Sequence, residues 1–309
     1  MKNSSPLCNG INRRQFIRTT AIAGAAVLSP WTALNLRAEE AAPKRTATDQ
    51  VTLGKTGIKL SRLGLGTGSS NGHEQTELGK EGFTSLVHYA YDHGITYFDT
   101  AQAYATFEWI GDAIKGLPRE KLFIQSKVPG KPKEVLSVID RHRKTFNTDY
   151  IDSLLVHCRV EKNWTDEWKY MMDAFDEAKE KKWIRAKGVS CHSLPALRAA
   201  TASDWPETHL VRINPQGSHM DGEEQEVWNL SEHKVDPVIE QIKTMHAKGH
   251  GVIGMKIIGN GDFRNPEDRE KSIRYAMSHK EIDAIVIGFT GKEQIDEAIE
   301  RINRALKEV

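Results

Sequence analysis

The sequence has little of several features that would place it in a special class of protein. Among its 309 residues it has only three cysteines, which excludes a disulfide-rich framework. Its 43 basic residues nearly equal its 42 acidic residues, so no basic field argues for nucleic acid as a partner. No apolar run reaches the ~20 residues that a membrane-spanning helix needs, so we expect no stable membrane anchor. With 39% apolar and 28% charged residues, the chain is typical of a globular protein in water.

The glycine fingerprint of a dinucleotide-binding Rossmann fold is also missing. Gly64, Gly66 and Gly68 follow the first candidate strand, but their spacing is not that of the fingerprint, and a long loop follows them instead of a helix. The sequence therefore does not predict a doubly wound sheet with that mode of nucleotide binding.

Residues 1–38 differ in composition from the rest of the chain, because they contain five basic residues and no acidic one. The pair Arg13 and Arg14 precedes a mildly apolar run over 19–34, and a small-residue cleavage candidate follows at 36–38. This arrangement resembles a twin-arginine export signal, whereas an ordinary amphipathic helix explains the arginine pair poorly. We expect a signal peptide over 1–38, a polar linker over 39–50, the Tat export machinery as a partner and a periplasmic or exported location.

From residue 51 onward the sequence predicts an α/β fold. A short hairpin over 51–60 is followed by apolar strand-like runs that alternate eight times with amphipathic helical segments, which is typical of a parallel sheet with crossover helices. Eight such units over this length favour a (β/α)8 TIM barrel over 51–309, preceded by an N-terminal β-hairpin. The predicted strands cover 62–66, 97–100, 122–127, 151–157, 186–190, 210–214, 251–257 and 284–288. The predicted helices cover 82–93, 107–115, 132–146, 165–182, 194–201, 236–248, 266–279 and 292–307.

Four polar residues stand at or just after the ends of three predicted strands. They are Asp99, Tyr104, Lys127 and His157, and in a barrel the carboxyl ends of the strands form the functional face. A phenol has a pKa near 10, and a neighbouring ammonium is expected to lower it so that the phenol can serve as a general acid. The carboxylate would hold the ammonium, and the imidazole would polarise a carbonyl oxygen. The set suits carbonyl reduction, and because no side chain donates a hydride, it implies a nicotinamide cofactor.

Each of these residues has an ordinary structural explanation when it is taken alone. Asp99 can cap a helix, Tyr104 can pack in a core, Lys127 can be solvated and His157 can be a satisfied interior histidine. Their coincidence at consecutive strand ends favours the catalytic interpretation.

Several motifs together resemble the aldo-keto reductase family from about residue 51 to the C-terminus. The resemblance implies an NAD(P)(H)-binding barrel oxidoreductase that interconverts a small carbonyl compound and its alcohol, with the four residues above as its catalytic tetrad. It rests on LGKTG at 53–57, GLGTG at 64–68, FDTA at 98–101 with Tyr104, Glu108 and Gly111, SKV at 126–128, DYID at 149–152 with His157, and GVS at 188–190. The cofactor-binding positions that it implies are Thr67, Asp99, Ser190, Cys191, Arg212, Met255, Lys256, Ile258, Gly288, Thr290, Gln294 and Glu297.

Some of these positions depart from the family pattern. Cys191 and Arg212 stand where the family usually has Asn and Gln, and Met255 stands where it has a stacking aromatic. Gln294 stands where many members have the arginine that binds a 2′-phosphate, so we expect no strong preference for NADP over NAD. Lys256 is placed to meet the pyrophosphate.

Two other classes of function stay open. The departures at Cys191 and Arg212 permit a cofactor-binding sensor with little turnover, which a panel of carbonyl substrates would distinguish. A metal-dependent barrel hydrolase or isomerase needs more strand-end carboxylates and histidines than the sequence offers. Cys158 and Cys191 each have a histidine beside them in the sequence. We do not expect these residues to form a metal site, because successive side chains of a strand point to opposite faces. We predict two ordinary thiols and no metal, with a disulfide as the alternative.

Overall fold

The computed structural model describes residues 45–227 and 231–308. The expected signal peptide and residues 39–44 of the expected linker lie outside these residues. Within the described part of the chain no helix is long and apolar enough to cross a membrane.

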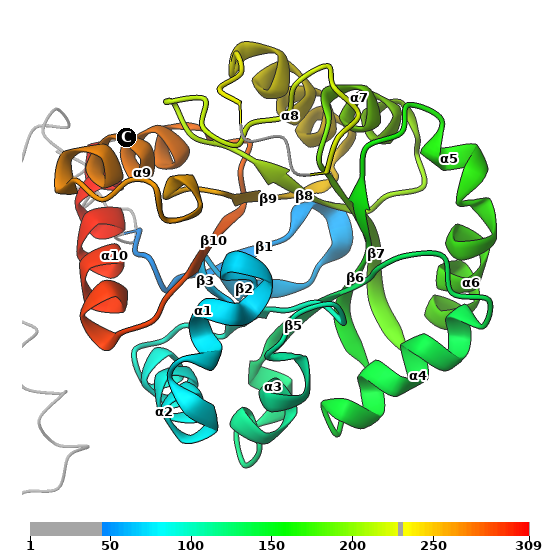
Figure 1. Cartoon of the computed structure of the whole chain (residues 1–309), viewed down its shortest axis with the longest axis horizontal. Coiled ribbons are helices and arrows are strands. Elements are labelled where there is room, and N and C mark those ends of the chain that lie inside the picture. The colour runs from blue at the N-terminus through cyan, green and yellow to red at the C-terminus, as the bar shows by residue number, and fades with distance from the viewer. Residues whose placement is uncertain (1–44, 228–230, 309) are drawn as a thin grey trace, which may run out of the picture. The chain divides into compact units, whose positions relative to one another are not determined.

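The core of the fold is a closed parallel barrel of eight strands surrounded by helices (Figure 1), as the alternating pattern predicted. The strands follow one another around the barrel in chain order, and β10 closes it by pairing with β3. Their bounds are β3 Leu63–Gly66, β4 Tyr97–Asp99, β5 Phe123–Val128, β6 Ile151–Arg159, β7 Ile184–Cys191, β8 Thr208–Arg212, β9 Gly251–Met255 and β10 Ala284–Gly288. The α-helices are α1 His73–Thr76, α2 Gly79–Asp92, α3 Phe107–Ala113, α4 Val135–Thr145, α5 Trp164–Glu167, α6 Lys169–Glu180, α7 Leu194–Ala202, α8 Asp236–Lys248, α9 Pro266–Ser278 and α10 Lys292–Ala305.

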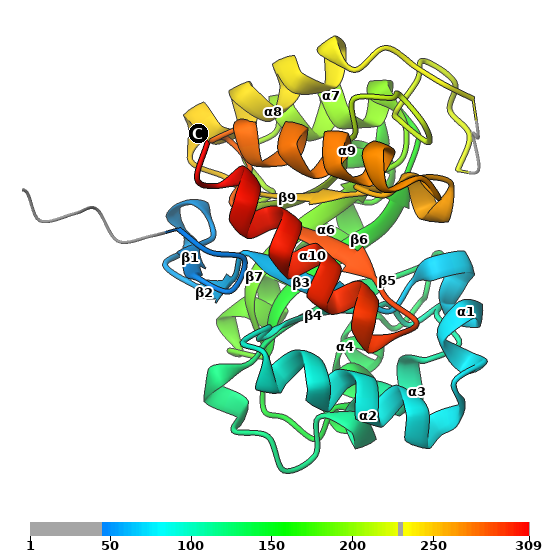
Figure 2. The ribbon, with the colours of Figure 1, turned by 90° about the vertical axis from the view of Figure 1, so that its left-hand side faces the viewer.

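The predicted hairpin is present as the antiparallel strands β1 (Gln50–Thr52) and β2 (Lys59–Ser61). Its turn contains Gly57 at φ +71°, a left-handed conformation that glycine adopts without steric cost. The hairpin covers the end of the barrel where the strands begin (Figure 2), and Leu53 and Leu60 pack into the barrel interior. The backbone N–H of Gly54 donates to Asp283 at 3.1 Å. The end of the barrel where the strands begin is therefore closed.

Two details differ from the sequence prediction. The helix expected over 165–182 is two helices, α5 and α6, because Trp168 between them has a non-helical backbone conformation. The packed chain also begins before residue 51, since Ala47 is fully buried and its N–H donates to Asn303 Oδ1 at 2.7 Å. This contact could not be predicted from the sequence, because one buried alanine and one long-range hydrogen bond produce no periodic pattern.

Side chains of the strands alternate between two apolar layers. Those that point inward fill the barrel and include Tyr97, Leu155 and Leu210, whereas those that point outward pack beneath the helices and include Leu154 and Val211. At Gly64 the inner layer leaves no room for a side chain, because a Cβ there would lie 2.1 Å from the ring of Tyr97. This alternation decides which strand-end residues face the mouth of the barrel.

Candidate active site

The structure brings the four predicted catalytic residues together at the end of the barrel where the strands finish, which we call the mouth of the barrel. Lys127, from β5, donates from Nζ to Asp99 Oδ1 at 2.8 Å and Oδ2 at 2.7 Å, and to the carbonyl oxygen of Thr100 at 2.8 Å. The same nitrogen lies 3.4 Å from the hydroxyl oxygen of Tyr104. The ring of His157, from β6, meets the ring of Tyr104 edge to face, with centroids 5.7 Å apart. Asp99, Lys127 and His157 are all buried.

The pKa of Tyr104 differs from what the sequence suggested. Burial, with the nearby Asp99 carboxylate as the next cause, raises the pKa of the phenol well above its usual value. The expected lowering of this pKa is not observed, because burial favours the neutral phenol and the Asp99 carboxylate offsets the charge of the neighbouring Lys127 ammonium. The phenol is therefore protonated at neutral pH, which is the form that donates a proton.

His157 is held uncharged by its surroundings. Burial, followed by the positive charges of Lys127 and Arg159, lowers the pKa of its imidazole well below the usual value. A neutral imidazole in this position can donate a hydrogen bond without carrying a charge.

Other residues that sequence reasoning missed support the cluster. Gln125 Nε2 donates to Asp99 Oδ1 at 2.9 Å and to the Tyr97 hydroxyl at 2.8 Å, which gives the carboxylate a second donor beside Lys127. Gly68 lies against Tyr104, since a Cβ there would come within 2.5 Å of the ring. Gln125 could have been predicted from the alternation of side chains along β5, which places it on the same face as Lys127.

A cleft of about 780 Å³ runs from this cluster along the ends of β9 and β10. Of the predicted positions, those that line it are Asp99, Tyr104, Met255, Lys256, Ile258, Gly288, Thr290, Gln294 and Glu297. Sequence reasoning missed others, above all Ser69, Asn260, Arg264 and Arg269. These residues lie on loops and near a helix start, where no periodic pattern indicates which side chains face a cavity.

Four predicted cofactor positions do not line this cleft. Thr67 and Ser190 are fully buried at the ends of their strands. Cys191 is fully buried among outward-facing residues beneath the helices, so its side chain cannot contact a nucleotide in the barrel mouth; this expectation was wrong because of the alternation along β7. Arg212 is buried, and its guanidinium turns toward His192.

Lys256 lines the cleft and has a strained backbone conformation. Its φ is +60°, a left-handed value that is uncommon outside glycine, and Nζ donates to Asn260 Oδ1 at 2.6 Å. Burial, followed by the charge of Arg212, lowers the pKa of its ammonium to about 8. Among the described residues this ammonium has a single hydrogen-bond partner, and with three donors it keeps capacity for a phosphate oxygen.

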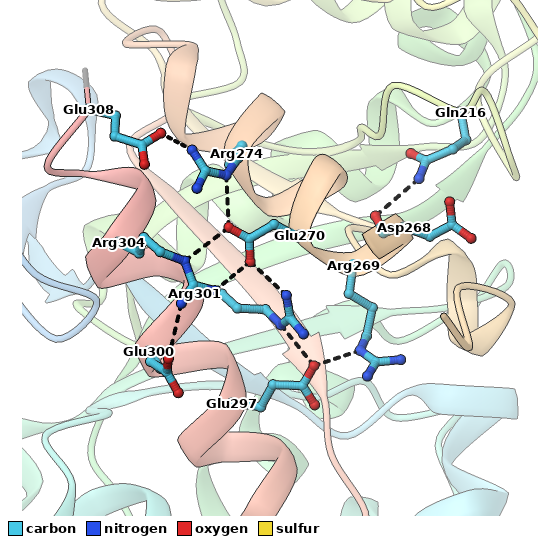
Figure 3. A network of polar contacts seen from close by, with 10 residues as sticks. All are labelled: Gln216, Asp268, Arg269, Glu270, Arg274, Glu297, Glu300, Arg301, Arg304 and Glu308. Atoms are coloured by element: carbon cyan, nitrogen blue, oxygen red, sulfur yellow. Dashed lines mark hydrogen bonds and ion pairs between the residues drawn. The ribbon is translucent and has the colours of Figure 1, made fainter. Parts of the chain in front are cut away.

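The far end of the cleft is built by α9 and α10. Gln294 Oε1 accepts the backbone N–H of Thr290 at 2.8 Å, and Glu297 accepts from Arg269 at 2.9 Å and Arg301 at 2.8 Å. Figure 3 shows how this pair of contacts continues into a network around Glu270, which binds Arg274, Arg301 and Arg304. The network ties the two helices together. Arg264, in contrast, is exposed at the cleft, and its guanidinium has no hydrogen-bond or ion-pair partner among the described residues.

These features fit an extended nicotinamide dinucleotide. Met255 offers an apolar wall beside Tyr104, and Lys256 and Arg264 offer positive charge farther along. The first backbone N–H groups of α10, a 14-residue helix with no side-chain cap at Gly291, point to the same end. Gly288 lets the side chain of Ser69 approach the end of β10 closely, since a Cβ there would lie 2.1 Å from Ser69 Oγ.

The two cysteines of the described part of the chain are not joined by a disulfide. Cys158 and Cys191 are separate thiols. Over residues 45–227 and 231–308 no group of three or more His, Cys, Asp or Glu side chains is arranged to hold a metal ion.

Asp221 should make the stability of the fold depend on pH. Burial raises the pKa of its carboxyl to about 7, although Arg212 opposes the shift. The folded state then binds this proton more tightly than the unfolded state between about pH 4 and pH 7, so the free energy of unfolding falls as pH rises, by up to ~1.4 kcal/mol per unit. Urea titrations should show that Asp221→Asn removes this part of the slope. Asp92→Asn, at an exposed carboxylate, is the control, and an identical slope in D221N and the parent would contradict the assignment.

The chain belongs to the aldo/keto reductase family, whose profile matches residues 62–308. This agrees with the barrel and with the arrangement of polar side chains at its mouth.

Curated relatives match parts of the chain. It is 29% identical over 138 residues to the 9,11-endoperoxide prostaglandin H2 reductase of Trypanosoma cruzi, covering 43% of this chain and 45% of that protein. It is 31% identical over 169 residues to the glyoxal reductase of Bacillus subtilis, covering 52% of this chain and 56% of that protein. The chain thus spans about half the length of these relatives.

A solved structure shows the same fold at low sequence identity. The holo form of an aldo-keto reductase from Bacillus halodurans superposes with a TM-score of 0.66 at 15% identity, covering 84% of this chain and 96% of that one. At this identity the likeness concerns the fold alone.

Proposed function

We propose that this protein is an NAD(P)-dependent oxidoreductase that interconverts a small aldehyde, ketone or sugar-like carbonyl compound and its alcohol. The observation that carries the proposal is the buried Lys127 ammonium, which both oxygens of Asp99 hold 3.4 Å from the Tyr104 hydroxyl at the end of a long cleft. Family membership and the reductase names of the relatives support it.

Each residue of the cluster has a separate task in this reaction. A bound NADH or NADPH supplies the hydride. Tyr104 donates a proton to the carbonyl oxygen, and Lys127 stabilises the phenolate that remains. Asp99 keeps the ammonium in place, and the neutral His157 donates a hydrogen bond to the same oxygen. Lys256 and the start of α10 would hold the phosphates.

Turnover of a panel of aldehydes, ketones and sugars with NADH or NADPH tests the proposal. We expect the absorbance of the reduced nucleotide to fall with at least one substrate. Nucleotide binding without turnover of any substrate would favour a sensor on the same fold. If neither nucleotide binds, the proposed function is wrong.

We also propose that the protein is exported in folded form by the twin-arginine route. The sequence pattern around Arg13 and Arg14 supports this. Replacing both by lysine should leave active protein in the cytoplasm, as cell fractionation would show, whereas Arg18→Lys should affect export less. Export of the double variant at the parental level would contradict the proposal.

A further inference from the structure

A chain of buried polar side chains lies behind the candidate catalytic histidine. Arg212 Nη1 lies 3.5 Å from Asp221 Oδ1, and Arg212 Nη2 lies 2.7 Å from Nδ1 of His192. On the other side of this imidazole, Nε2 lies 3.6 Å from Sγ of Cys158, the residue that follows His157. The proposed proton donation by Tyr104 uses none of these four side chains.

The contact with Arg212 decides where His192 carries its proton. A guanidinium only donates hydrogen bonds, so Nδ1 of His192 must accept at 2.7 Å. The carbonyl oxygen of Val227 is farther from this nitrogen, at 3.4 Å, and already accepts from Arg212 at 3.1 Å. Burial, followed by the charge of Arg212, lowers the pKa of His192 well below its usual value, so the ring is neutral. Its single N–H is therefore on Nε2.

This N–H is a donor with too weak a partner. The thiol sulfur of Cys158 is a poor acceptor, and 3.6 Å is a long contact. The positive charge of Arg212 on the opposite nitrogen polarises the ring and strengthens donation from Nε2. A better acceptor, such as a substrate oxygen, would gain a strong hydrogen bond here.

His192 also lies next to His157, which the proposed function places at the reacting carbonyl oxygen. Its ring is nearly perpendicular to that of His157, at a centroid distance of 6.4 Å, and it is 8% exposed, whereas Arg212 and Asp221 behind it are 3% and 1% exposed. A register shift between Val156 and Arg159 interrupts the pairing of β6 with β7. The left-handed backbone of Cys158, at φ +56°, lies within this bulge. Bulges of this kind re-aim side chains next to active sites.

We propose, on the basis of the function above, that His192 is a specificity-determining donor that selects carbonyl compounds bearing an oxygen on the neighbouring carbon. Tyr104 and His157 would bind the reacting oxygen, and Nε2 of His192 would bind a hydroxyl, second carbonyl or carboxylate oxygen one carbon away. The nearby cations Lys127, Arg159, Arg212 and Lys256, which all act on Cys158, favour electron-rich oxygens in this position.

A comparison of two substrates of equal size tests the proposal. Glycolaldehyde and propanal differ by a hydroxyl in place of a methyl group, and the ratio of their kcat/KM values is measured in each variant, so that differences in hydration cancel. We expect His192→Phe to lower the glycolaldehyde-to-propanal ratio by about 5- to 30-fold, the range for one buried hydrogen bond. His192→Gln, which keeps an N–H donor, should restore part of the ratio. His209→Phe is the matched control, since His209 is buried in the outward-facing layer of β8 and bonds to His250.

The outcomes separate this inference from the proposed function. If His192→Phe leaves the ratio of the kcat/KM values unchanged, whether or not both values fall, the proposed role of His192 is overturned and the reductase proposal stays intact. If the parent protein reduces neither these aldehydes nor any other carbonyl compound, the reductase proposal fails. Nitrogen-15 NMR of the histidines gives a test without substrate: His192 should carry its proton on Nε2 in the parent, and Arg212→Met should mix the two tautomers. A proton on Nδ1 in the parent would also overturn the inference.

Discussion

Tyr104→Phe should reduce carbonyl turnover by about 10²-fold or more while leaving nucleotide affinity nearly unchanged. The substitution removes only the hydroxyl, which is the group that donates the proton, and general acids typically contribute rate factors of this size. The ring stays in place because Gly68 and His157 still pack against it. Steady-state kinetics and a fluorescence titration with the reduced nucleotide would measure the two effects.

Tyr170→Phe is the matched control for this variant. Tyr170 is 41% exposed on the surface, so loss of its hydroxyl should change neither rate nor affinity. A Tyr104→Phe protein that keeps most of its turnover would show that another group donates the proton.

Lys127→Met should have two large effects, one on catalysis and one on stability. Without the ammonium 3.4 Å from the hydroxyl oxygen of Tyr104, the phenolate left by proton donation loses its stabilising charge, so the rate at neutral pH should fall by about 10²-fold. In the direction of alcohol oxidation, which needs the phenolate, the pH profile should move to higher pH. The buried Asp99 carboxylate also loses its ion-pair partner, which typically costs ~3–5 kcal/mol of unfolding free energy.

Two further variants separate these effects. Asp99→Asn in the Lys127→Met background removes the unpaired carboxylate and should restore part of the stability but not the rate. Lys131→Met, at an exposed lysine nearby in sequence, should alter neither. An unchanged pH profile for Lys127→Met would mean that this ammonium has no part in proton transfer.

The sequence was sufficient to predict the barrel and the cluster of polar residues at its mouth. Both follow from periodic patterns, because each strand in a parallel barrel ends on the same face, and Asp99, Lys127 and His157 stand at such ends. Tyr104 lies in the loop after β4, and its proximity to Lys127 depended on the family resemblance as much as on the strand pattern.

Other parts of the site depend on contacts that no local pattern contains. The bulge at Cys158 changes which side chains of β6 face the mouth, and the tautomer of His192 depends on Arg212, 20 residues away in sequence. The sequence also favoured a lowered pKa for Tyr104, since a neighbouring lysine is visible in a sequence whereas the depth of burial is not.

The N-terminal hairpin has a consequence for how the protein is made. Gly54 bonds to Asp283, β3 pairs with β10, and the backbone of Ala47 bonds to Asn303. The first segments of the barrel thus find partners 229 and 256 residues later along the chain, and loops of such length close slowly. The barrel can therefore close only once β10 has been synthesised, and chains cut short before β10 would be left open and exposed to proteolysis.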